Sequence, residues 1–96
     1  MKNESLYNEI VKLKSMLEEG NIPFEIEEVY NGHRMAYPNK QKIVCSIIEH
    51  DFSIGNKYDM LEIMGLLTEE EKEDDCVKGY LTAEDVFNRI NNHYNK

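Results

Sequence analysis

Carboxylates are the most abundant side chains in this sequence that could do chemistry, and they gather in one part of the chain. The 96 residues include 19 acidic and 11 basic side chains, for a formal net charge of −8. Residues 49–85 hold 12 of the acidic side chains against three lysines, so this segment carries −9 and the rest of the chain +1. Clustered carboxylates attract basic surfaces and speed association with them. The sequence therefore predicts that segment 49–85 docks on a basic surface of a protein partner, the alternative being a solvated stretch that only keeps the protein soluble.

The candidate partner-binding residues are the acidic side chains in the middle of this segment. They are Asp59, Glu62, Glu69, Glu70, Glu71, Glu73, Asp74 and Asp75. Their order lacks the DxDxDG register of a calcium-binding EF-hand loop, so we interpret them as a surface and not as a metal site.

The remaining reactive residue types show none of the usual spacings for catalysis or metal binding. His33, His50 and His93 fall on different predicted elements, and the sequence has no HxxxH, HExxH or CxxC motif. Cys45 and Ser46 lie inside a predicted strand without a GxSxG nucleophile elbow, and the five glycines are scattered, so no phosphate loop is expected. We therefore predict no catalytic residues, no metal and no cofactor, and a protein that is not an enzyme.

A second candidate surface lies on the predicted hairpin. Tyr30, His33, Arg34 and Tyr37 fall close together there. Tyrosine and arginine are enriched at the centres of protein interfaces. Side chains alternate between the two faces of a strand, so part of this cluster is also expected to face the core.

An amphipathic helix over residues 4–19 is the first element that must position these side chains. Asn3 or Ser5 can cap its start, and Gly20 can end it in the left-handed conformation. Its apolar residues recur at spacings of four, three and four, as one buried helical face requires. They are Leu6, Ile10, Leu13 and Leu17.

Three strands are predicted next, over residues 24–30, 33–37 and 42–49. The first alternates apolar and polar residues with a period of two, and the third is rich in β-branched residues. Asn31-Gly32 is a strong signal for a type I′ hairpin turn, which needs positive φ at both central residues. Short turns between all three strands predict an antiparallel meander.

An irregular acidic stretch follows the meander, and a second amphipathic helix ends the chain. We predict a short helix over residues 58–64 and a capping box of Thr68 and Glu71 that opens a short acidic helix. Thr82 is the predicted N-cap of the last helix, with Asp85 at its third position. The whole chain, residues 1–96, is therefore expected to be one two-layer α+β domain, with the long helices on one face of a three-stranded sheet.

The composition also bears on location and on other classes of partner. The chain has no basic face that could displace counterions from nucleic acid, and no run of about 18 apolar residues that could span a membrane. Residues 1–10 lack the apolar region of a signal peptide. We therefore expect a cytoplasmic protein that binds neither nucleic acid nor membranes.

Four blocks of the sequence carry a resemblance to known proteins. They are VYNGHRMAYP (29–38), VCSII (44–48), LEIMGLLTEEE (61–71) and GYLTAEDVFNRI (79–90). These blocks resemble small uncharacterised proteins encoded by phages and prophages of Gram-positive bacteria. The resemblance implies a cytoplasmic protein of a bacterial host that binds a host or phage protein, for example as an inhibitor, and it brings no functional residues with it.

Two alternatives remain open from the sequence. One is a small-ligand-binding or enzymatic domain with a pocket between the sheet and the acidic stretch. The other is a homodimeric accessory protein that associates through a sheet edge or through exposed tyrosine and methionine side chains.

Overall fold

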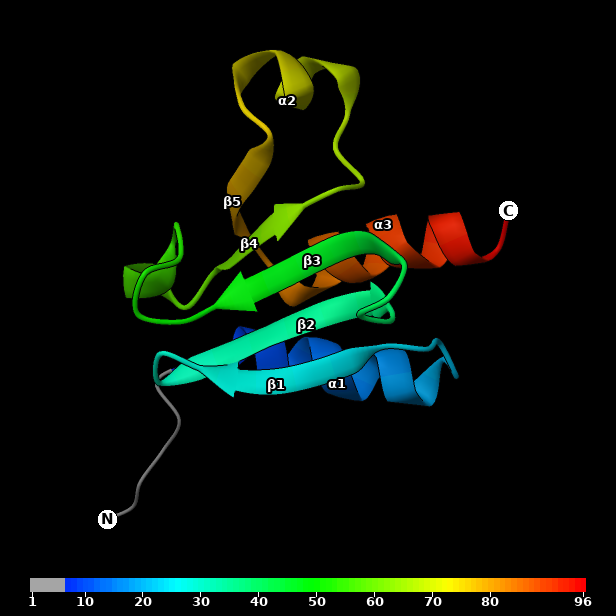
Figure 1. The fold of residues 1–96 in the computed structure, drawn as a ribbon, viewed down its shortest axis with the longest axis horizontal. Coiled ribbons are helices and arrows are strands. Elements are labelled where there is room, and N and C mark those ends of the chain that lie inside the picture. The colour runs from blue at the N-terminus through cyan, green and yellow to red at the C-terminus, as the bar shows by residue number, and fades with distance from the viewer. Residues whose placement is uncertain (1–6) are drawn as a thin grey trace.

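Five strands form one antiparallel sheet in the order of the chain, and two helices cover one of its faces (Figure 1). The computed structural model describes residues 7–96, and the statements below concern this part of the chain. The elements are α1 (Glu9–Glu19), β1 (Glu25–Val29), β2 (Gly32–Pro38), β3 (Ile43–Glu49), the 3-10 turn η1 (Asn56–Tyr58), β4 (Leu61–Met64), α2 (Glu69–Asp74), β5 (Val77–Leu81) and α3 (Ala83–Tyr94). The predicted α+β class is confirmed. The predicted three-stranded meander is incomplete, because β4 and β5 extend it to five strands.

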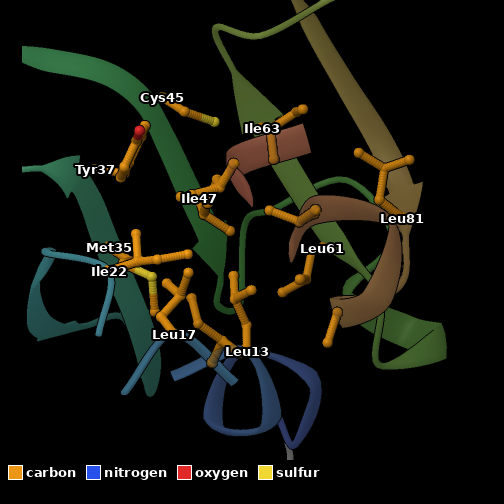
Figure 2. Packing of buried hydrophobic residues seen from close by; sticks show 14 residues of the cluster. Leu13, Leu17, Ile22, Met35, Tyr37, Cys45, Ile47, Leu61, Ile63 and Leu81 are labelled. Atoms are coloured by element: carbon orange, nitrogen blue, oxygen red, sulfur yellow. The ribbon is translucent and has the colours of Figure 1, made fainter. Parts of the chain in front are cut away.

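The core lies between the sheet and the pair α1 and α3. Ile10, Leu13 and Leu17 of α1 are fully buried at the spacing that the sequence predicts. The side chains of Leu13 and Leu17 converge with those of β2, β3 and β4 (Figure 2). The strand register aligns Met35, Ile47 and Ile63 in one row facing the helices.

The helix caps are confirmed at α2 and α3 and shifted at α1. Thr68 and Thr82 each close a capping box with the third residue of the helix. Helix α1 begins at Glu9 and not at the predicted residue 4, and its predicted caps Asn3 and Ser5 lie outside the described residues. Gly20 ends α1 with φ −85°, and the left-handed residue is Asn21, with φ 57°.

The first hairpin turn is one residue earlier than predicted. Tyr30 and Asn31 are its central residues, with φ of 46° and 65°, and Val29 pairs with Gly32. Gly32 is therefore the first residue of β2, where a Cβ atom would lie 2.0 Å from the backbone oxygen of Glu49. Glycine is needed at this position for the close approach of β2 and β3 and not for the turn itself.

The predicted helix over residues 58–64 is wrong. Residues 61–64 form strand β4, which pairs with β3 and buries Leu61 and Ile63 on the helix-covered face. A strand buries two side chains two residues apart on that face, and it also satisfies the backbone groups at the free edge of β3. Strand β5 then pairs with β4, with an irregularity in the register between Leu61 and Ile63.

None of the helices within residues 7–96 has the length and the apolar character needed to cross a membrane.

Candidate functional site

The acidic side chains of residues 69–75, here called the acidic projection, stand outside the sheet and its two covering helices. Helix α2 lies at the far end of the segment between β4 and β5, beyond the end of the sheet (Figure 1). None of the α2 side chains is buried. The capping box of Thr68 and Glu71 fixes the start of the helix: the Glu71 N–H donates to Thr68 Oγ1 over 3.2 Å, and the Thr68 N–H donates to Glu71 Oε1 over 2.8 Å.

An ion pair with α3 holds the acidic projection in place. Arg89 Nη1 and Nη2 each donate to one carboxylate oxygen of Glu71 over 2.7 Å, and Nη1 also donates to the Leu66 carbonyl oxygen over 3.0 Å. The pair is sheltered, with 22% of the Arg89 side chain and 17% of the Glu71 side chain exposed. The hydrogen bonds from Arg89 lower the pKa of Glu71 to about 2. Glu71 is thus a structural residue and has no free oxygen to offer a partner.

Two more of the eight candidate carboxylates stabilise the fold through hydrogen bonds to the backbone. Asp59 Oδ1 accepts hydrogen bonds from the backbone N–H groups of Asn8 and Glu9, over 2.7 and 3.2 Å, at the start of α1. Glu62 Oε1 accepts one from the Ile54 N–H over 2.7 Å and so fixes the loop before β4. Both side chains are half-buried and lie apart from α2 in the chain.

The other five candidate carboxylates are exposed and share one small region. They are Glu69, Glu70, Glu73, Asp74 and Asp75. Lys72 is the one cation within the acidic projection and lies 3.3 Å from a carboxylate oxygen of Glu69, in a fully solvated pair. Exposed pairs of this kind contribute little free energy, so a cationic partner can replace Lys72 at small cost. The structure therefore brings together five of the eight predicted residues.

The second candidate surface is not one surface. The Tyr37 side chain is buried, and its hydroxyl lies 2.7 Å from Nδ1 of His93 on α3. His33 shares the helix-covered face with Tyr37, whereas Arg34 lies on the opposite face and Tyr30 is exposed in the hairpin turn. The alternation along β2 separates these residues onto two faces of the sheet.

A buried carboxyl group, missed by the sequence analysis, lies at the end of β3. Glu49 has 0% exposure, and its Oε1 accepts a hydrogen bond from the Ile10 N–H of α1 over 3.0 Å. Burial, together with a hydrogen bond to Asp59, raises the pKa of Glu49 to about 9. The pKa of Asp59 is lowered in spite of its partial burial, by hydrogen bonds from Glu49 and from the N–H groups of Asn8 and Glu9. The signal in the sequence was the alternation of Cys45, Ile47 and Glu49, which places all three side chains in the core.

The buried carboxyl groups do not form a metal site. Across residues 7–96, no group of three or more histidine, cysteine, aspartate or glutamate side chains is arranged to hold a metal ion. Glu49 and Asp59 instead supply acceptors for the first N–H groups of α1, which have no partner within the helix. Their role is to join α1 to the end of β3.

One hollow of the protein is on the sheet face that no helix covers. Its volume is about 550 Å³. Its lining comes from β1, β2, β3 and the residues around the end of β4, and it includes none of the acidic candidate residues. This groove is on the open face of the sheet and is not the pocket that the sequence suggested between the sheet and the acidic stretch.

Comparison of the chain with protein-family profiles, with curated proteins and with solved structures finds no match.

Proposed function

We propose that this chain is a non-enzymatic protein-binding domain of the phage type, and that its acidic projection docks on a basic surface of a host or phage protein in the bacterial cytoplasm. An acidic helix that covers a basic functional surface would act as an inhibitor of that protein. The resemblance of the four sequence blocks supports the phage setting, and the charge distribution supports the kind of partner.

One observation carries the proposal: the acidic projection is anchored to α3 by an ion pair while five of its carboxylates stay exposed. Arg89 fixes α2 through Glu71, and the other five carboxylates remain in solvent. A preorganised charged surface loses less conformational entropy on binding than a flexible acidic loop does. This arrangement favours a docking surface over a stretch that merely adds solubility.

The electrostatics favour a cationic partner over other classes. The segment that contains the acidic projection carries −9, and the rest of the chain +1. Such an asymmetric charge speeds association with positive surfaces at low salt and excludes phosphate backbones. Binding by this surface should therefore weaken as ionic strength rises, since exposed charges beyond about 10 Å are screened at 0.1 M salt.

The test compares two variants with the same change in net charge. The first replaces the five free carboxylates by their amides: Glu69→Gln, Glu70→Gln, Glu73→Gln, Asp74→Asn and Asp75→Asn. The matched control replaces five exposed carboxylates elsewhere: Glu18→Gln, Glu19→Gln, Glu25→Gln, Glu28→Gln and Glu84→Gln. Both leave Glu71 intact, so that α2 keeps its anchor.

The variants and the wild-type protein are used as affinity baits in lysate of a Gram-positive bacterium, at about 0.05 and 0.5 M salt. We expect the wild-type and control baits to capture the same basic protein at low salt, and the projection variant to lose it. Equal capture by both variants, or capture that survives high salt, would refute docking through the acidic projection.

A further inference from the structure

The open face of the sheet departs from the pattern of a solvated antiparallel sheet. Such a face normally carries polar side chains at alternate positions. Here the register places Ala36, Ser46 and Met64 side by side on adjacent strands, with Val44 next to them. The small side chains of Ala36 and Ser46 form the floor of the groove of about 550 Å³.

The two walls of the groove differ in chemistry. One wall is apolar and consists of Met64 and Ile43, each with 54% of its surface exposed. The other is an ion-pair network in which Glu27 accepts from Arg34 Nη2 over 2.6 Å and from Lys40 Nζ over 3.3 Å. The groove therefore combines exposed apolar surface with charges that already have partners.

The charges that line the groove are nearly balanced, unlike those of the chain as a whole. Glu27 pairs with Arg34 and Lys40, and the Glu25 carboxylate accepts from the Lys40 N–H. The charged residues that line the groove are one carboxylate and two cations, so the lining does not share the acidic excess of the whole chain, which carries −8. Two copies approaching through their acidic projections would repel each other, but this face can meet its own copy without that penalty.

We propose that this groove is a homodimer interface, in which two copies pack their open sheet faces against each other about a twofold axis. A twofold interface needs one patch that carries both a protruding and a receiving part. Met64 protrudes at one wall, and the floor of Ala36 and Ser46 receives it in the other copy. Face-to-face packing of two sheets leaves about 10 Å between them, enough for one interdigitated layer of side chains.

An anionic ligand fits the groove less well than a second copy does. Arg34 and Lys40 already bind Glu27, so an anion would have to displace that carboxylate. An uncharged apolar molecule would leave the polar wall without new partners. The second copy is therefore the occupant that matches both walls.

The test is sedimentation velocity of the full chain from about 1 to 300 µM, the range of weak and transient interfaces. We expect a concentration-dependent rise from the monomer mass of 11.3 kDa to twice that value. Met64→Lys and Ser46→Arg each place a charge in the groove and should raise the dissociation constant about tenfold or more. Val11→Lys removes a comparably exposed apolar side chain from the outer face of α1 and should leave the constant unchanged.

Several outcomes would overturn the proposal. A wild-type protein that stays monomeric over the whole range excludes a dimer, provided that its thermal melt shows a folded protein. Equal dissociation constants for Met64→Lys and Val11→Lys place any dimer on another surface. Binding of the uncharged apolar dye N-phenyl-1-naphthylamine to monomeric wild type, with loss on Ser46→Arg, assigns the groove to a small ligand instead.

Dimerisation through the groove and binding through the acidic projection should differ in their dependence on salt concentration. Since the groove charges are paired within each copy, we expect the dimer to persist at about 0.5 M salt. The fivefold amide variant of the acidic projection should dimerise at least as well as wild type. Loss of the dimer in that variant or at high salt would show that the acidic surface mediates it, and would contradict the groove assignment without touching the docking proposal.

Discussion

Two groups of carboxylates in this protein have opposite roles: one group binds backbone groups within the fold, and the other is exposed at the surface. At the start of α1, Glu49 and Asp59 are inside or half inside the protein and accept hydrogen bonds from backbone N–H groups. In the acidic projection, five carboxylates are exposed on a short helix and at its end, and a sixth, Glu71, holds that helix. The acidic excess is thus divided: one part builds the fold, and the other is left exposed to solvent.

The largest expected effect comes from Asp59→Ala. The change leaves the Asn8 and Glu9 N–H groups without acceptors and places alanine at φ 56°. We expect a loss of about 3 kcal/mol in the free energy of unfolding, from the lost cap and the left-handed conformation together. Urea denaturation measures it, with Asp74→Ala at the exposed end of α2 as the control. Equal losses in the two variants would contradict the division of the carboxylates.

The next effect is a gain in stability from Glu49→Gln. The pKa of Glu49 is about 9 in the folded protein, against an ordinary value of 4.5. Between these values the folded state keeps a proton that the unfolded state releases, so stability falls by up to about 1.4 kcal/mol per pH unit as pH rises. Glutamine keeps the acceptor for the Ile10 N–H and offers an amide donor to Asp59 without needing that proton.

The variant should therefore be more stable than wild type by about 3 kcal/mol at pH 7 and lose most of the pH dependence between pH 5 and 9. Thermal melts at several pH values check this. Wild-type stability that is flat over the same window would show that Glu49 is ionised in the folded state.

A smaller effect is expected at the anchor of the acidic projection. Arg89→Ala removes both donors to Glu71 and should cost about 1–3 kcal/mol. The pKa of Glu71 is lowered to about 2, so the contribution of the pair is complete above about pH 4.5 and is lost as pH falls toward 2. Hydrogen exchange should accelerate in α2 and not in α1, and Arg89→Lys should restore only part of the protection. Uniform acceleration across both helices would instead indicate global destabilisation.

Much of the fold is predictable from local patterns in the sequence. The apolar spacing in α1 and α3 and the capping boxes at Thr68 and Thr82 depend on residues within a few positions of one another. Strands β4 and β5 are different, because a four-residue strand such as Leu61–Met64 is defined by the free edge of β3 that it joins. The short apolar pattern of that segment also suits a helix, so periodicity alone could not decide.

Only part of the candidate site could be predicted, because the roles of its other residues depend on partners that are distant in the sequence. Charge density alone identified the acidic segment, and five of its eight candidate residues are exposed together. Glu71 could not be separated from its neighbours, because its partner Arg89 is 18 residues away on another helix. Glu49 and Asp59 likewise acquire their roles only when the start of α1 reaches the end of β3.

The most direct test of this account is the stability of the fivefold amide variant of the acidic projection, measured by urea denaturation at neutral pH. The account predicts a free energy of unfolding within about 0.5 kcal/mol of wild type, because exposed carboxylates contribute little to the fold. A loss of more than about 2 kcal/mol would show that these side chains hold the structure together. They would then not be the free surface on which the proposed function depends.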